Sequence, residues 1–88
     1  MEFYIIVHTY FPSGVCSRMI KLEIENDTII SVNFTGGCSG NTQGVAKLVE
    51  GMNIDYAISK LSGINCNGRG TSCPDQLSKA LKEAKEKL

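Results

Sequence analysis

The chain has 88 residues, of which 42% are hydrophobic and 20% charged, and its nine basic residues balance nine acidic ones. A domain of this length buries about 60–65% of the surface of the unfolded chain, so it commonly needs a disulfide, a metal ion or a partner subunit for stability. A net charge of zero argues against direct binding of nucleic acid, and no stretch approaches the roughly 20 apolar residues of a membrane span. We therefore interpret residues 1–88 as a single domain that contacts neither nucleic acid nor a membrane directly.

The first 36 residues have the pattern of β-strands. Residues 3–11 are rich in β-branched and aromatic types and are followed by the turn-forming triplet Pro12-Ser13-Gly14. A turn is predicted at Asn26-Asp27, and on each side of it apolar residues alternate with polar ones. The apolar residues are Ile20, Leu22 and Ile24 before the turn and Ile30, Val32 and Phe34 after it. The pattern predicts three antiparallel strands with one buried face.

The second half of the chain has helical spacing. A glycine-rich loop at residues 36–41 precedes a helix that ends near Gly51, and Asn53 is placed to cap a second helix that ends near Gly63. After a polar loop at residues 65–72, the last helix carries an apolar stripe of Leu77, Leu81, Ala84 and Leu88. Strands followed by helices predict an α+β fold, in which about three helices pack on one face of a three-stranded antiparallel sheet.

The four cysteines are the strongest chemical signal. Cys16, Cys38, Cys66 and Cys73 all lie where the chain turns, whereas an inert buried cysteine is more often found within a strand or helix. The N-terminus lacks the basic segment of an export signal, so we expect a cytoplasmic protein, in which cysteines serve more often as metal ligands or redox groups than as disulfides. A shared metal site is the leading interpretation, while thiol–disulfide chemistry and structural cysteines remain open.

Charged and polar neighbours fit a site of thiolates. Pro74 is expected at the first helical position, which would make Cys73 the N-cap, where the helix dipole favours a thiolate. Four thiolates on a divalent ion leave two negative charges, which Arg18 and Arg69 would offset unless they are ordinary surface arginines. Asn41 in the glycine-rich loop and Asp75 in the first turn of the last helix complete the predicted surroundings.

Other kinds of site fit less well. The glycine-rich loop lacks the Gly-Lys-Ser/Thr ending of a phosphate-binding loop. His8 is the only histidine and lies in a strand pattern, so we interpret it as a strand residue and not as a ligand. Without an evident nucleophile and base we expect no catalytic residues.

Several of these motifs resemble the TSCPD-domain family. The stretch Thr71-Ser72-Cys73-Pro74-Asp75-Gln76-Leu77 is similar to the signature that names the family. Residues 14–18, 36–42 and 63–66 are similar to its other motifs, so the resemblance covers nearly the whole chain. The family includes small stand-alone proteins and a C-terminal domain of cobalamin-dependent ribonucleotide reductases. The resemblance therefore implies metal binding by the four cysteines and a link to deoxyribonucleotide synthesis.

A second, weaker resemblance is to the iron–sulfur scaffold proteins IscU and the N-terminal part of NifU. Cys16, Cys38 and Cys73 look like the three scaffold cysteines. Arg18 stands where the scaffolds have an aspartate, Ser72 stands where they have a histidine, and Cys66 is an additional thiol. These departures favour a closed four-thiolate site over cluster transfer.

Three functions follow from these observations. The first is a metal-binding module, holding zinc or an iron–sulfur cluster, that presents a surface to a ribonucleotide reductase or another protein partner. The second is a thiol redox relay or accessory component of ribonucleoside-diphosphate reduction. The third is an iron–sulfur scaffold. Thiol ligands alone do not distinguish zinc from iron–sulfur.

Overall fold

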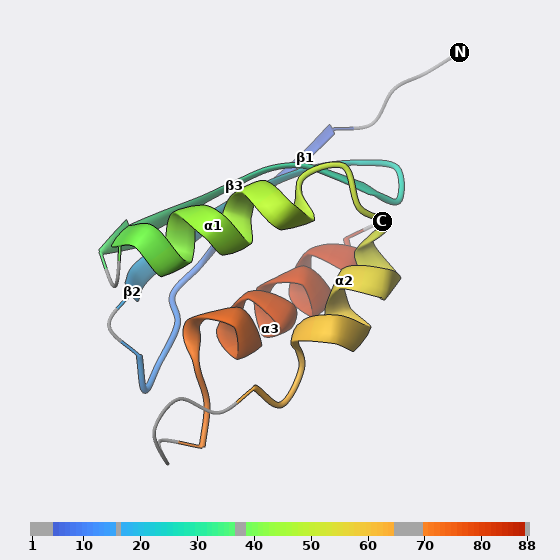
Figure 1. Cartoon of the computed structure of the whole chain (residues 1–88). Coiled ribbons are helices and arrows are strands. Elements are labelled where there is room, and N and C mark those ends of the chain that lie inside the picture. The colour runs from blue at the N-terminus through green and yellow to red at the C-terminus, as the bar shows by residue number, and fades with distance from the viewer. Residues whose placement is uncertain (1–4, 16, 37–38, 65–69, 88) are drawn as a thin grey trace.

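The computed structural model describes residues 5–15, 17–36, 39–64 and 70–87, and of residues 39–41 it describes the backbone. The chain forms three strands and then three helices, which are β1 (Ile5–Tyr10), β2 (Ser17–Glu25), β3 (Thr28–Gly36), α1 (Ser39–Val49), α2 (Ile54–Leu61) and α3 (Cys73–Lys85). The strands pair antiparallel in the order β1-β2-β3. This arrangement confirms the predicted α+β fold (Figure 1).

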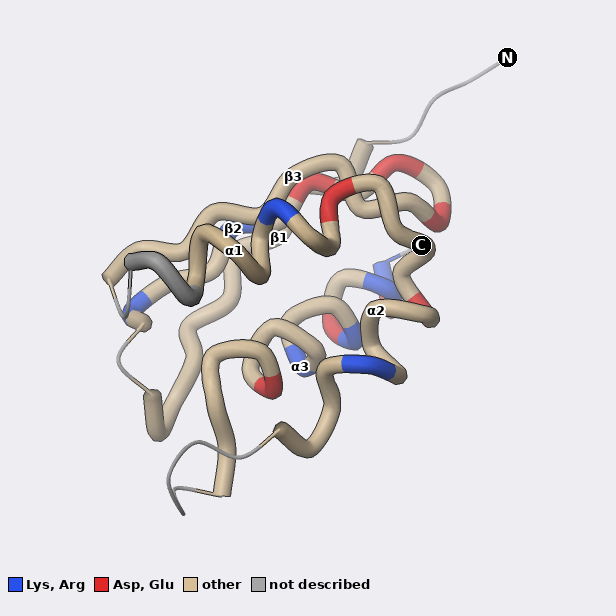
Figure 2. The backbone as a smooth tube through the Cα atoms, in the orientation of Figure 1, with Lys and Arg blue, Asp and Glu red and all other residues tan. Residues whose placement is uncertain are grey.

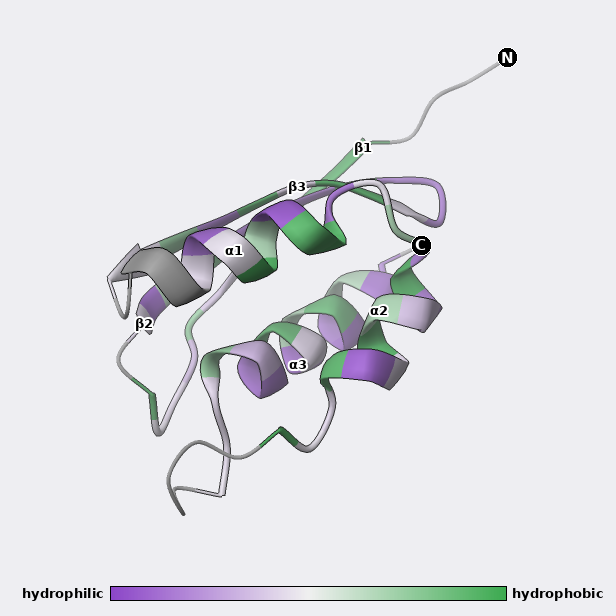
Figure 3. Ribbon diagram, in the orientation of Figure 1, coloured by the Kyte–Doolittle hydropathy of each residue, from purple (hydrophilic) through white to green (hydrophobic). Residues whose placement is uncertain are grey.

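The helices cover one face of the sheet, and the hydrophobic core lies between the two layers. The apolar stripe predicted on the second strand, Ile20, Leu22 and Ile24, is fully buried. Leu77, Leu81 and Ala84 of α3 and Ile54 and Ala57 of α2 are buried against it. Figure 3 shows hydrophobic segments along α1, α2 and α3, the helices that lie over the sheet. Burial of each large aliphatic side chain contributes about 1.5–3 kcal/mol, so this layer is the main source of stability.

The β2–β3 hairpin contains a bulge that changes which isoleucine faces the core. Glu23 pairs with Ser31 but Ile24 pairs with Ile29, so β3 has one additional residue at this point. Ile29 is therefore fully buried, whereas Ile30 is 43% exposed. The prediction that Ile30 lies on the apolar face was wrong, because a bulge shifts the alternation of side chains by one residue.

The predicted helix boundaries are largely confirmed. Asn53 caps α2, where its side-chain oxygen accepts hydrogen bonds from the backbone N–H groups of Asp55 and Tyr56. Within α1 the core-facing residues are Thr42, Ala46 and Val49, and Leu48 is 72% exposed. None of the helices in the described part of the chain has the length and apolar character needed to cross a membrane.

His8 lies on the helix-covered side of β1 and is only 8% exposed. Neither ring nitrogen has a hydrogen-bond partner among the described residues. Burial lowers the pKa of His8 below its usual 6.5, Lys87 lowers it further, and Glu83 acts in the opposite direction. The neutral imidazole is therefore the form that the fold accommodates, since the described residues offer its two nitrogens no hydrogen bond.

We predict that protonation of His8 destabilises the fold. Because its pKa is lower in the folded than in the unfolded state, this contribution to stability is complete above pH 6.5 and is lost as the pH falls through and below that value. His8→Phe should flatten the pH dependence of the urea midpoint between pH 7.5 and about 5.5. It should also stabilise the protein by about 1–3 kcal/mol, because no buried nitrogen then lacks a partner. An unchanged slope in this variant would contradict the assignment.

Candidate functional site

The predicted site residues fall partly outside the described residues. The side chains of Cys73, Arg18 and Asp75 are described, whereas Cys16, Cys38, Cys66, Arg69 and the side chain of Asn41 lie outside this part of the chain. Among the described residues no group of three or more His, Cys, Asp or Glu side chains is arranged to hold a metal ion. Only one of the four cysteines is in that set, so the four-cysteine site stays a prediction.

Cys73 begins α3 but is not its N-cap. Ser72 occupies the cap in an extended conformation, and its hydroxyl accepts a hydrogen bond from the backbone N–H of Asp75 at 3.1 Å. Cys73 is the first helical residue and Pro74 the second, where the missing N–H of proline costs no helical hydrogen bond. The prediction that Cys73 caps the helix was wrong because the serine hydroxyl is the better acceptor for the free N–H groups of the first turn.

Ser17 brings the start of β2 against Cys73. Its hydroxyl oxygen lies 3.0 Å from the Cys73 sulfur, and Ser17 is 3% exposed. Ser17 pairs with Gly36 at the end of β3, whereas Met19 pairs with Thr35, so Arg18 is an additional residue in β2. This second bulge directs Ser17 inward and leaves Arg18 exposed. A serine hydroxyl at this distance is placed to donate a hydrogen bond to a thiolate.

A continuous chain of hydrogen bonds surrounds the first turn of α3. The side-chain oxygen of Gln76 accepts from the Ser13 N–H and the Tyr10 hydroxyl, both at 3.2 Å. The Gln76 amide donates to the Thr71 hydroxyl at 2.9 Å, and Thr71 donates to Asp75 at 2.6 Å. The other carboxylate oxygen of Asp75 accepts from the Gly63 N–H at 2.7 Å. The loop at residues 11–15 and the described residues Gly63 and Thr71 are thereby joined to α3.

Asp75 is the charged residue at the end of this series of hydrogen bonds. Its side chain is buried, yet its pKa is held below the usual value, first by the Thr71 hydrogen bond and then by the Gly63 N–H. Burial opposes this shift, and Lys79 and Lys82 support it. Figure 2 shows no charged residue in the described parts of the loops beside this end of α3, while basic residues occur further along α2 and α3. The ionised carboxylate therefore acts as a fixed acceptor for the two ends of one loop.

Described residues near the three other cysteines are linked to this turn, directly for Cys16 and Cys66 and through a strand pair for Cys38. Ser17, which follows Cys16, contacts Cys73, and Gly36, two residues before Cys38, pairs with Ser17. Gly63 and Thr71, which flank the segment containing Cys66, both bind Asp75. Segments that are distant in the sequence are thus brought to one place in the fold.

Sequence reasoning missed Ser17, Thr71 and Gln76 as parts of this arrangement. Ser17 directly follows a cysteine, and the other two lie in the signature stretch, so each was close to a recognised motif. The contact between Ser13 and Gln76 spans 63 positions, and no local pattern predicts such a pair.

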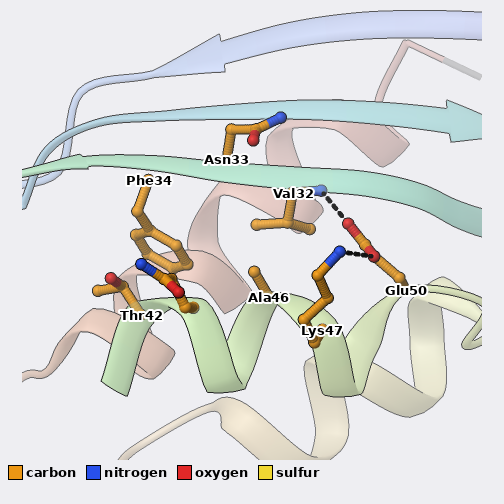
Figure 4. Close-up of a pocket in the computed structure, with 8 residues that line it drawn as sticks. Val32, Asn33, Phe34, Thr42, Ala46, Lys47 and Glu50 are labelled. Carbon is orange, nitrogen blue, oxygen red and sulfur yellow. Dashed lines mark hydrogen bonds and ion pairs between the residues drawn. The ribbon is translucent and has the colours of Figure 1, made fainter. Parts of the chain in front are cut away.

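A separate groove lies between β3 and α1 (Figure 4), where Phe34 and Ala46 form apolar walls. Lys47 and Glu50 pair on the α1 side of the groove at 3.7 Å, and Glu50 also accepts a hydrogen bond from the Val32 N–H of β3 at 3.4 Å. Val32 belongs to an edge strand, so Glu50 satisfies a donor that the sheet leaves open. The lining contains no nucleophile–base pair, and we do not assign it a catalytic role.

Gly14 is where the loop after β1 approaches the signature segment. Its φ angle is +74°, and a Cβ atom added there would lie 3.1 Å from the Thr71 methyl group. Because two hydrogen bonds hold the Thr71 hydroxyl, its side chain cannot rotate away without breaking them.

We therefore expect Gly14→Ala to lower the free energy of unfolding by about 1–3 kcal/mol. Gly51→Ala is the matched control, since Gly51 has a φ angle of +90° but no atom near the added methyl group. Urea denaturation should show the larger loss for Gly14→Ala. Equal losses would mean that backbone strain alone, and not the contact with Thr71, limits this position.

Comparison with known proteins gives one match. The family model of the TSCPD domain matches residues 5–85. No curated protein and no solved structure matches the chain. The resemblance to IscU and NifU thus stays a prediction. The family match spans all three strands and all three helices, from the start of β1 to the end of α3. The chain belongs to the TSCPD-domain family.

Proposed function

We propose that this protein is a small cytoplasmic metal-binding module, in which Cys16, Cys38, Cys66 and Cys73 together ligate one zinc ion or one iron–sulfur cluster. The observation that carries the proposal is that Ser17, which follows Cys16, contacts Cys73 at the first turn of α3, and that Gly63 and Thr71, which flank the segment containing Cys66, bind Asp75 in the same turn. Gly36, two residues before Cys38, pairs with Ser17 in the sheet. The donor set also fits, since four thiolates suit both zinc and iron–sulfur clusters. When bound, the metal would cross-link the sheet to the loops around α3.

The residues of this chain have distinct tasks in such a site. The Ser17 hydroxyl is placed to donate to the Cys73 thiolate, and the N-terminus of α3 provides a favourable dipole for negative charge. Arg18 is exposed on the bulge next to Cys16, where a cation would offset part of the thiolate charge. Asp75 holds the loop that contains Cys66 and Arg69 at both of its described ends.

Metal binding would also supply stability. Structural zinc contributes an apparent ~10–16 kcal/mol to small domains, which is comparable to the ~5–15 kcal/mol stability of a typical protein. A domain of 88 residues with a small core therefore gains a large share of its stability from such a site.

We predict one zinc ion or one iron–sulfur cluster per chain in protein purified without oxygen. Elemental analysis and the visible absorption spectrum distinguish the two, and a strong chelator should unfold the protein as followed by circular dichroism. Cys73→Ser should lose the metal, while Ser59→Ala, an exposed change on α2, should retain it. Folded protein with less than about a tenth of an equivalent of metal would refute the proposal.

A second candidate is a thiol relay for ribonucleotide reduction, the process to which the family resemblance points. Cys73 is partly exposed and free of a disulfide, as a relay thiol must be. In this role Cys66 and Cys73 would pass two electrons and two protons to a disulfide of a ribonucleotide reductase. The disulfide that they form would then be reduced by an external dithiol.

Alkylation rates separate the two candidates. A relay requires exposed reactive thiols, so iodoacetamide should modify Cys66 and Cys73 of the native protein as fast as a free thiol. Metal-bound thiolates should react slowly, and chelation should accelerate all four cysteines together. Peptide mass spectrometry of timed samples gives each rate, and slow modification before chelation would exclude the relay.

A further inference from the structure

Gln76 is a polar residue in the buried part of α3. It is 2% exposed, and the residues that follow it on the core side of the helix, Leu77, Ala80, Leu81 and Ala84, are apolar and fully buried. A leucine or methionine of similar volume would fill this space without a polar group to satisfy. The presence of an amide indicates that specific hydrogen bonds are needed here.

The orientation of the Gln76 amide is determined by its partners. The Ser13 backbone N–H can only donate, so the atom that faces it must be the side-chain oxygen, which also accepts from the Tyr10 hydroxyl. The amide nitrogen then faces the Thr71 hydroxyl, which is free to accept because its own proton goes to Asp75. These hydrogen bonds form a series in which each donor gives its proton in the direction of Asp75, and the Asp75 carboxylate is the final acceptor.

These contacts join two segments that lead to cysteines. Tyr10 is the last residue of β1, and Ser13 lies three positions before Cys16. Thr71 lies two positions before Cys73 and, through Asp75, is joined to Gly63, three positions before Cys66. Of the described residues, Gln76 is the one that hydrogen-bonds both to the loop after β1 and to the signature segment.

We propose that Gln76 is a positioning residue of the four-cysteine site, which sets the segment carrying Cys16 relative to Cys73 without binding the metal itself. This inference rests on the proposed function and adds a role to a side chain outside the ligand set. Residues that orient ligands are worth about 10–100-fold in metal affinity. An apolar residue at this position would preserve burial but release the Ser13 N–H and the Thr71 hydroxyl from their shared partner.

Three variants test the proposal. Gln76→Leu removes every contact of the amide, and Tyr10→Phe removes only one hydroxyl hydrogen bond. Leu81→Ala is the control, because it destabilises the same helix from a fully buried position outside the hydrogen-bond chain. Metal binding and folding are coupled, so affinity alone does not separate positioning from general destabilisation.

Two measurements on metal-loaded protein make that separation. With saturating cobalt(II), the wild type and Leu81→Ala should share one sulfur-to-cobalt charge-transfer spectrum, whereas Gln76→Leu should show a weaker and altered one. In zinc-loaded Gln76→Leu, iodoacetamide should modify Cys16 at least about tenfold faster than in the wild type, with a much smaller change at Cys38. Tyr10→Phe should change the Cys16 rate in the same direction by a smaller factor, and it provides the test if Gln76→Leu does not fold.

The failures of the two proposals are distinguishable. A wild-type protein that shows neither thiolate–cobalt absorption nor, when purified without oxygen, bound zinc or an iron–sulfur spectrum would refute the metal site itself. A wild-type protein that binds cobalt, together with a Gln76→Leu variant that has the same spectrum, would overturn the positioning role and leave the metal site intact. Equal acceleration of all four cysteines in Gln76→Leu would also overturn it, because general loosening of the fold would then explain the variant.

Discussion

The Asp75 carboxylate is ionised and buried at the start of α3, and its charge is matched by donors from two segments of the chain. Thr71 and Gly63 hydrogen-bond to it directly, and Gln76 extends the chain to the loop after β1. In a buried network each polar group needs its partner, so the loss of one member leaves the others unsatisfied. The relative positions of the loops that flank the cysteines depend on this network.

The network also explains the residues of the family signature. The Thr71 hydroxyl accepts from Gln76 and donates to Asp75. Ser72 caps the helix, and Pro74 occupies a helical position at which no N–H is needed. Asp75 is the charged acceptor of two segments. Cys73 differs from the other four in that its one described side-chain contact is the Ser17 hydroxyl, which suits a residue whose thiol chemistry is used.

The two bulges show how small irregularities in a sheet direct side chains. An additional residue at Arg18 turns Ser17 toward Cys73, and an additional residue at Ile30 turns Ile29 into the core. Both lie in strands whose sequence alternates well, so the pattern predicted the strands but not the points where the alternation shifts. His8 is a comparable case, since its place in a strand was clear but its burial without a hydrogen-bond partner in the described part of the chain was not.

Local patterns in the sequence were sufficient to predict the order of three strands and three helices, the cap at Asn53 and the family, because alternation, helical spacing and motifs are local properties. The contact between Ser17 and Cys73, and the hydrogen bonds by which Gln76 joins Ser13 to Thr71, are visible only in the folded chain. The first pair is 56 positions apart, and the Gln76–Ser13 contact spans 63. Such contacts arise from packing the helices on the sheet, and a period of two or of 3.6 residues carries no information about which side chains this packing brings together.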